Sequence, residues 1–161
     1  MTARIKKIWQ GLTVTWNIYL SGEIHTDWRD EIITGAKHLD TIFTGPVTDH
    51  EASDDCGASI LGHEDKKFWY DRKGAGINGI RTKKLLVDAD IVIVRFGEKY
   101  KQWNAAFEAG FASALGKSLI ILHSEEHQHA LKEVDTAALA VTSSTEEVIK
   151  ILNYVINGKL D

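Results

Sequence analysis

Asp88-Ala89-Asp90-Ile91-Val92-Ile93-Val94 and Leu119-Ile120-Ile121-Leu122 are the two stretches that decide the fold class. Each contains four consecutive apolar residues, which is the pattern of a strand covered by helices on both of its faces. Strands of this kind belong to parallel sheets, whose connections are right-handed crossovers. We therefore expect an α/β fold with a parallel sheet as its middle layer.

Strands and helices alternate on both sides of these two stretches. Further strands are predicted from β-branched and aromatic content at residues 13–20, 40–44 and about 139–141. Helices are predicted after the capping residues Thr26 or Asp27, Asn104 and Ser144, and from the apolar spacing of residues 77–86. The alternation predicts a doubly wound, three-layer sheet of about five parallel strands. Residues 47–62 have no clear period and are expected to form a lid or binding loop.

The composition narrows the class of protein. The chain has 161 residues, enough for one domain with a substantial core, and a formal net charge of -4. That charge argues against a protein built to bind a nucleic acid polymer, but it leaves a small nucleotide possible. Apolar runs are far shorter than the ~20 residues of a membrane helix. The single cysteine, Cys56, and the lack of a secretory signal predict a cytoplasmic protein.

Ligands of open parallel sheets bind at the carboxyl ends of the strands. Four polar segments follow predicted strands: residues 21–25, 45–56, 95–108 and 123–129. Within the third, Glu108 lies in the first turns of a helix and close to aromatic residues, so its carboxylate could act as a nucleophile or stabilise a sugar oxocarbenium ion. The alternative is an acidic residue favoured by the helix dipole alone.

Other candidates carry weaker signals. Ser21-Gly22-Glu23-Ile24-His25 could cradle a sugar or phosphate but lacks the dinucleotide-binding spacing, and a plain strand-to-helix turn is the alternative. Tyr19 and Trp103 stand where a base could stack, although core packing explains them equally. The acidic residues 49–55 do not have EF-hand spacing, and His123, His127 and His129 do not form an HExxH pattern. Solvated loops are favoured there, and we expect no metal and no cofactor.

Two pairs of motifs resemble a known superfamily. Residues 18–22 (Ile-Tyr-Leu-Ser-Gly) and 104–117 (Asn-Ala-Ala-Phe-Glu through Gly-Lys) resemble the nucleoside 2-deoxyribosyltransferases, and residues 19–28 and 43–51 resemble their YtoQ branch. The likeness covers residue 14 to the end as one domain and leaves residues 1–13 as an N-terminal extension. It implies a flavodoxin-like fold, a homodimer or larger assembly, and cleavage of the N-glycosidic bond of a 2-deoxynucleoside or its monophosphate.

The resemblance also implies roles for single residues. Glu108 matches the glutamate that attacks the anomeric carbon, Tyr19 the tyrosine that lies over the sugar, and Asp90 an aspartate at the start of the third strand region. Two carboxylates that help to protonate or orient the base are missing, because Gly76 and Gln102 occupy their positions. Their loss favours the alternative of a non-catalytic nucleotide-binding sensor.

The sequence thus predicts cleavage or transfer of the N-glycosidic bond of a (deoxy)nucleoside or nucleotide, with metal-dependent hydrolysis as a further alternative. The catalytic candidates are Glu108, Asp90, Asp49 and His50. The substrate-binding candidates are Tyr19, Ser21, Gly22, Glu23, His25, Asn104 and Trp103. The base, the sugar and the acceptor are not specified by the sequence.

Overall fold

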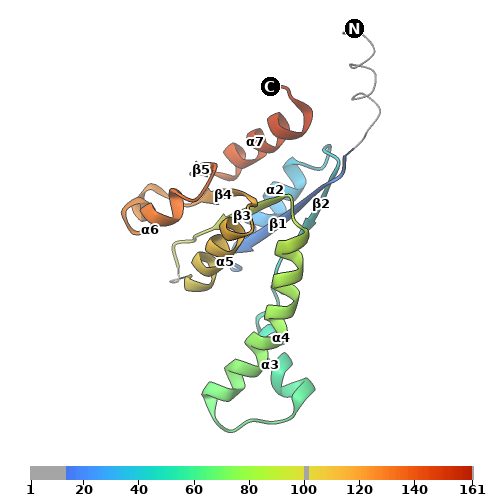
Figure 1. Cartoon of the computed structure of the whole chain (residues 1–161), viewed down its shortest axis with the longest axis vertical. Coiled ribbons are helices and arrows are strands. Elements are labelled where there is room, and N and C mark those ends of the chain that lie inside the picture. The colour runs from blue at the N-terminus through green and yellow to red at the C-terminus, as the bar shows by residue number, and fades with distance from the viewer. Residues whose placement is uncertain (1–13, 100–101, 161) are drawn as a thin grey trace.

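The structure is a computed structural model that describes residues 14–99 and 102–160 (Figure 1). The predicted N-terminal extension, residues 1–13, lies outside the described residues. The part of the chain that is described contains no helix long and apolar enough to cross a membrane.

A parallel sheet forms the middle layer, as predicted. Its five strands are β1 (Trp16–Gly22), β2 (Thr41–Thr44), β3 (Ile91–Arg95), β4 (Ser118–Leu122) and β5 (Ala140–Thr142). They lie in the order β2-β1-β3-β4-β5, and each neighbouring pair is parallel. The helices are α2 (Trp28–Gly35), α3 (His50–Leu61), α4 (Lys67–Asp88), α5 (Trp103–Ala114), α6 (Gln128–Asp135) and α7 (Thr145–Asn157), with a 3-10 turn, η1 (Glu125–His127), before α6.

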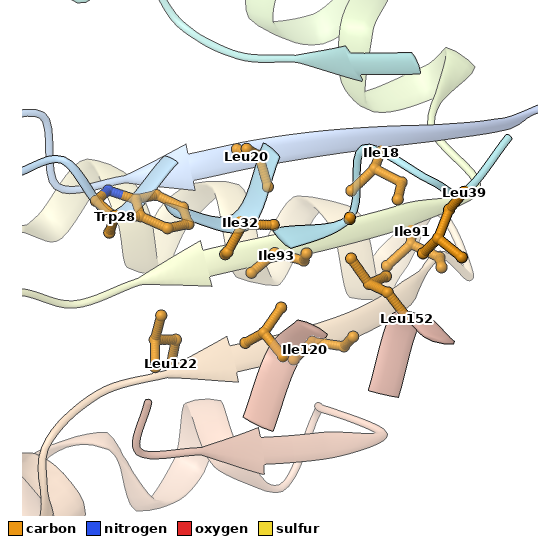
Figure 2. Close-up of a cluster of buried hydrophobic side chains, with 12 residues drawn as sticks. Ile18, Leu20, Trp28, Ile32, Leu39, Ile91, Ile93, Ile120, Leu122 and Leu152 are labelled. Atoms are coloured by element: carbon orange, nitrogen blue, oxygen red, sulfur yellow. The ribbon is translucent and has the colours of Figure 1, made fainter. Parts of the chain in front are cut away.

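Helices α2 and α7 cover one face of the sheet. Alternate residues of β1, β3 and β4 point to this face, because successive side chains of a strand face opposite sides. They pack against Trp28 and Ile32 of α2 and against Val148 and Leu152 of α7 (Figure 2). Ile33 of α2 and Val155 of α7 are apolar residues of these helices that remain exposed, by 39% and 44%. Each lies at the edge of its helix's apolar stripe, beyond the reach of the sheet.

Helices α4, α5 and α6 cover the other face. Val92 and Val94 of β3 and Leu119 and Ile121 of β4 are fully buried against them. Helix α5 presents a row of small buried residues to the sheet: Ala105, Ala109 and Ala112. Because alanine occupies little space, α5 lies close over β1, β3 and β4, and this closeness brings its polar residues to the strand ends.

The predicted loop over residues 47–62 is wrong, since most of it forms helix α3. Asp49 caps the helix by accepting a hydrogen bond from the Ala52 N–H at 2.8 Å. Gly57 allows α3 to pack tightly on α4, because a Cβ at this position would lie 2.3 Å from the backbone nitrogen of Gly74. The two helices form a hairpin that projects from the sheet (Figure 1). The polar residues 123–129 are likewise structured, as η1 and the start of α6.

Candidate active site

A cleft of about 480 Å³ opens where the strand order of the sheet reverses. β1 and β3 are parallel neighbours in the sheet, but the chain leads from β1 to β2 on one side and from β3 to β4 on the other. The loops after these two strands therefore diverge and leave a crevice at their carboxyl ends. Gly22 pairs with Arg95 at this edge and adopts a φ of +102°. A Cβ at Gly22 would lie 2.1 Å from the carbonyl oxygen of Arg95, so glycine allows the strand end to pass this close. The size of the cleft fits a nucleoside-sized ligand.

Glu108 of α5 lines this cleft. Tyr19 and Ser21 point from β1 toward the same helix, because they are two residues apart on one strand. The Ser21 hydroxyl donates a 2.5 Å hydrogen bond to Oε2 of Glu108. The buried Tyr19 hydroxyl lies near both Glu108 and Thr82, although the geometry to neither is that of a regular hydrogen bond. The carboxylate is thus held at the end of β1 with its position fixed by the strand.

The surroundings of Glu108 raise its pKa above the ordinary value of a carboxyl group. Burial is the main cause, and it is opposed by the Ser21 hydrogen bond, the Tyr19 hydroxyl and the positive charge of Arg29. Burial also raises the pKa of Tyr19, and the negative charge of Glu108 adds to the effect. A partly desolvated carboxylate beside hydroxyl groups is suited to form a bond to an electrophilic carbon.

Arg29 of α2 holds the end of β1 together. Its Nε donates to the carbonyl oxygen of Leu20 at 3.1 Å, its Nη2 to that of Gly22 at 3.1 Å, and its Nη1 to that of Glu23 at 2.5 Å. Its guanidinium also lies 4.6 Å from the centre of a Trp28 ring. Arg29 is the second residue of α2, and the sequence carried no signal that it belongs to the site.

The remaining walls of the cleft come from three helices and from Pro46 and Val47, which lie between β2 and α3. Asn104 and Phe107 share the face of α5 that carries Glu108, and this is the predicted place for Asn104. The hairpin supplies polar groups that the list of candidates lacked: Ser53 and Asp54 from α3 and Asn78, Arg81 and Thr82 from α4. The Asn78 side-chain amide donates to the carbonyl oxygen of Ser53 at 2.9 Å, which links the two helices beside the cleft. Ser53 and Asp54 were missed because residues 47–62 were interpreted as a loop. Asn78, Arg81 and Thr82 lie in a segment that was predicted to be helical, but no local pattern marked its position over the cleft.

Two predicted site residues lie elsewhere. Asp90 precedes β3, at the amino end of the sheet, where its carboxylate accepts a 2.8 Å hydrogen bond from the backbone N–H of Asn17. It is therefore at the edge opposite the cleft. Trp103 lines a separate cavity between the β3–α5 segment and α6, because successive residues of a helix are turned by about 100° and Trp103 does not share the Glu108 face.

Four other candidates lie at the correct edge but in different settings. Gly22 lines the cleft, whereas the Glu23 side chain is buried beneath the turn. His25 is exposed, and its backbone N–H donates to Glu23 Oε1. Asp49 is exposed and its carboxylate caps α3. The fifth candidate, His50, begins α3, but its side chain lies outside the described part of the structure.

The two departures from the superfamily pattern also have a place in the structure. Gln102 lines the same separate cavity as Trp103, and its Oε1 accepts a 2.9 Å hydrogen bond from the Gly97 N–H. Gly76 lies on α4 and lines neither of the two cavities. Within residues 14–99 and 102–160, no three His, Cys, Asp or Glu side chains are grouped so that they could hold a metal ion.

Comparison with known proteins gives the family. Residues 19–156 match the family described as Nucleoside 2-deoxyribosyltransferase YtoQ. The chain belongs to the YtoQ family. The YtoQ protein of Bacillus subtilis (strain 168) is 43% identical over 140 residues, which are 86% of this chain and 95% of that protein. The resemblance seen in the sequence is thus confirmed.

Solved structures share the fold of this YtoQ family chain. A 2-deoxyribosyltransferase from Bacillus psychrosaccharolyticus matches with a TM-score of 0.51 and 15% identity, over 83% of this chain and 90% of that one. A conserved protein from Enterococcus faecalis V583 matches with the same TM-score and identity, over 84% and 96% of the two chains. At this identity the likeness shows that the architecture is shared.

Proposed function

We propose that this YtoQ family chain cleaves or transfers the N-glycosidic bond of a (deoxy)nucleoside or nucleotide, with Glu108 as the nucleophile. The observation that carries the proposal is the Glu108 carboxylate, which lines a nucleoside-sized cleft at the switch point and is hydrogen-bonded to Ser21. The family match, and the fold shared with a 2-deoxyribosyltransferase, support the same chemistry.

The proposed reaction has two displacements. A Glu108 oxygen forms a bond to the anomeric carbon while the carbon–nitrogen bond breaks, and the electron pair of that bond leaves with the base. The base takes a proton from an acid in the cleft or from solvent. Water, or a second base, then attacks the anomeric carbon and releases the carboxylate, which gives hydrolysis or transfer respectively.

Asp54 is the acidic residue that we propose beside the base. It lines the cleft from α3, together with the amide of Asn78 from α4. Asp49 and His50 stand at the start of the same helix and were the sequence-based choices for acid–base help. Asp54 lies a full turn further along α3, where the helix faces the cleft.

Incubation with a panel of deoxynucleosides, ribonucleosides and their 5′-monophosphates, followed by detection of free base, tests the proposal. We expect base release from at least one member of the panel, and exchange when a second free base is added if the protein is a transferase. No release from any member, with protein that binds nucleosides, would contradict the proposal.

A nucleotide-binding sensor of the same fold is the second candidate. The observation that favours it is the replacement of two expected carboxylates by Gly76 and Gln102, neither of which lines the cleft. Binding of a nucleoside or nucleotide in the micromolar range without any base release identifies the sensor.

We also propose a homodimer or larger assembly. Large apolar side chains near the tip of the α3–α4 hairpin support it, because they are more than half exposed: Ile60, Leu61, Phe68 and Trp69. Light scattering coupled to size-exclusion chromatography measures the molar mass directly. A monomer over the whole accessible concentration range would contradict this part of the proposal.

The pH dependence of base release tests the setting of Glu108. The nucleophile must be ionised, so kcat/KM is expected to fall as the pH is lowered through the pKa of Glu108. Because that pKa is raised, the fall should begin at a higher pH than it would for an ordinary carboxyl group. The Ser21 hydrogen bond stabilises the anion and lowers this pKa. Ser21→Ala is therefore expected to move the acidic limb to still higher pH.

The matched control for this shift is Ser59→Ala, an exposed serine of α3 that does not line the cleft. Its acidic limb should coincide with that of the wild type. If Ser21→Ala lowers the rate equally at every pH, Ser21 does not act on the ionisation of Glu108.

A further inference from the structure

The turn between β1 and α2 stands beside the cleft, at a place where α/β proteins often bind phosphate. Gly22 and Ile24 of this turn line the cleft, and the first helical residue, Trp28, follows shortly after. Backbone N–H groups between a first strand and its helix commonly point at an anionic ligand. In this chain two donors of the turn, the His25 N–H and the Thr26 hydroxyl, already have an acceptor.

That acceptor is the Glu23 carboxylate. The backbone N–H of His25 donates to Glu23 Oε1, and the hydroxyl of Thr26 donates to Oε2 at 2.5 Å. The Glu23 side chain is only 2% exposed, so the negative charge is internal to the turn. Its Cγ lies against Gly97, where even a Cβ would come within 2.4 Å. The chain's own carboxylate thus occupies two donors that a bound phosphate could otherwise use.

The two arginines near the turn, Arg29 and Arg95, also have interaction partners within the chain. Arg95 Nε lies 3.8 Å from Glu23 Oε2 and offsets its charge. The three donor nitrogens of Arg29 face the carbonyl oxygens at the end of β1. Neither Arg29 nor Arg95 lines the cleft, so neither provides there the paired donors that phosphate recognition by arginine uses.

Other charges near the turn repel an anion. Asp30 and Glu31 lie in the first turn of α2, where their charges oppose those of the helix N-terminus. Among the residues that the structure describes, the cleft is lined by one basic side chain, Arg81, and by two acidic ones, Asp54 and Glu108. The balance of charge favours a ligand without a phosphate group.

We infer that Glu23 is a specificity-determining residue whose carboxylate fills the β1–α2 turn, so that the cleft takes unphosphorylated glycosides and excludes their 5′-monophosphates. The inference rests on the proposed function and narrows its substrate class. The resemblance to the deoxyribosyltransferases alone left nucleosides and nucleotides equally open.

The test compares wild type, Glu23→Gln and a control, Glu98→Gln. Glutamine has nearly the size of glutamate but removes the charge, and its amide oxygen can still accept from His25. Glu98 is an exposed carboxylate at the same edge of the sheet, and it lines the separate cavity rather than the cleft. Circular dichroism and thermal melting establish that each variant is folded.

Calorimetry then measures binding of a deoxynucleoside, its 5′-monophosphate and inorganic phosphate to each protein. Wild type is expected to bind the nucleoside at least about tenfold more tightly than the monophosphate. Glu23→Gln should reduce the preference for the nucleoside over the monophosphate by about tenfold, and it should bind inorganic phosphate more tightly than wild type. Glu98→Gln should match wild type in both measurements.

Wild type that binds the monophosphate better than the nucleoside would overturn the inference, even if Glu23→Gln fails to fold. An unchanged ratio and unchanged phosphate binding in folded Glu23→Gln would also overturn it. The proposed function fails separately, through the absence of base release, because the phosphate comparison needs no turnover.

Discussion

Replacing Glu108 by glutamine is expected to lower the rate of base release by roughly a thousandfold or more. Glutamine keeps the shape of the side chain and can still accept the Ser21 hydrogen bond, but its neutral amide is a poor nucleophile. Binding of the nucleoside is expected to change by less than about tenfold, because the cleft walls are retained. Free base is measured by chromatography under single-turnover conditions, and affinity by calorimetry.

Glu98→Gln is the matched control for this experiment as well. It removes one carboxylate from the same edge of the sheet without touching the cleft. Its rate should stay within about twofold of wild type. Equal base release by wild type and Glu108→Gln would refute the role of Glu108 even though an activity exists.

Gly22→Ala is expected to lower the free energy of unfolding by about 3 kcal/mol or more. Two costs add together at this position. A side chain is strained at a φ of +102°, and the new Cβ would lie 2.1 Å from the Arg95 carbonyl oxygen, a backbone atom that cannot move without breaking the β1–β3 pairing. Urea denaturation followed by circular dichroism measures the loss.

Gly116→Ala separates the two costs. Gly116 also has a positive φ, of +69°, but nothing lies within 4 Å of its missing Cβ. We expect a loss of about 1 kcal/mol from backbone strain alone. Equal losses in the two variants would show that the close approach of Gly22 to Arg95 does not matter for stability.

The sheet could be predicted from the sequence because its central strands are continuously apolar. Ile91 to Val94 and Leu119 to Leu122 fit a layer covered on both faces, and the structure confirms it. The α3–α4 hairpin could not be predicted in the same way. Its polar residues bury little against the sheet, and α3 is held by the Asp49 cap and by the close contact of Gly57 with Gly74, which depends on two distant segments.

The parts of the site that could be predicted from the sequence are those whose placement depends on a single strand or helix. The alternation of a strand turns Tyr19 and Ser21 toward α5, but both are fully buried and neither lines the cleft as a substrate-binding residue would. Asn104 and Glu108 share one turn of a helix and both line the cleft. Asp90 was misplaced because a residue before a strand lies at the amino end of the sheet. The groups that α3 and α4 bring to the cleft depend on tertiary packing, and no local pattern marks them.

The most direct test of the nucleophile is a mass measurement on the protein itself. A nucleoside with fluorine at the 2′ carbon slows both displacements, because fluorine disfavours the oxocarbenium-like transition state, so a glycosyl-enzyme can accumulate. The account predicts a protein carrying one covalently bound sugar, mapped by peptide sequencing to Glu108 and missing in Glu108→Gln. Base release with the sugar attached to another residue, or with no attachment and undiminished release by Glu108→Gln, would contradict it.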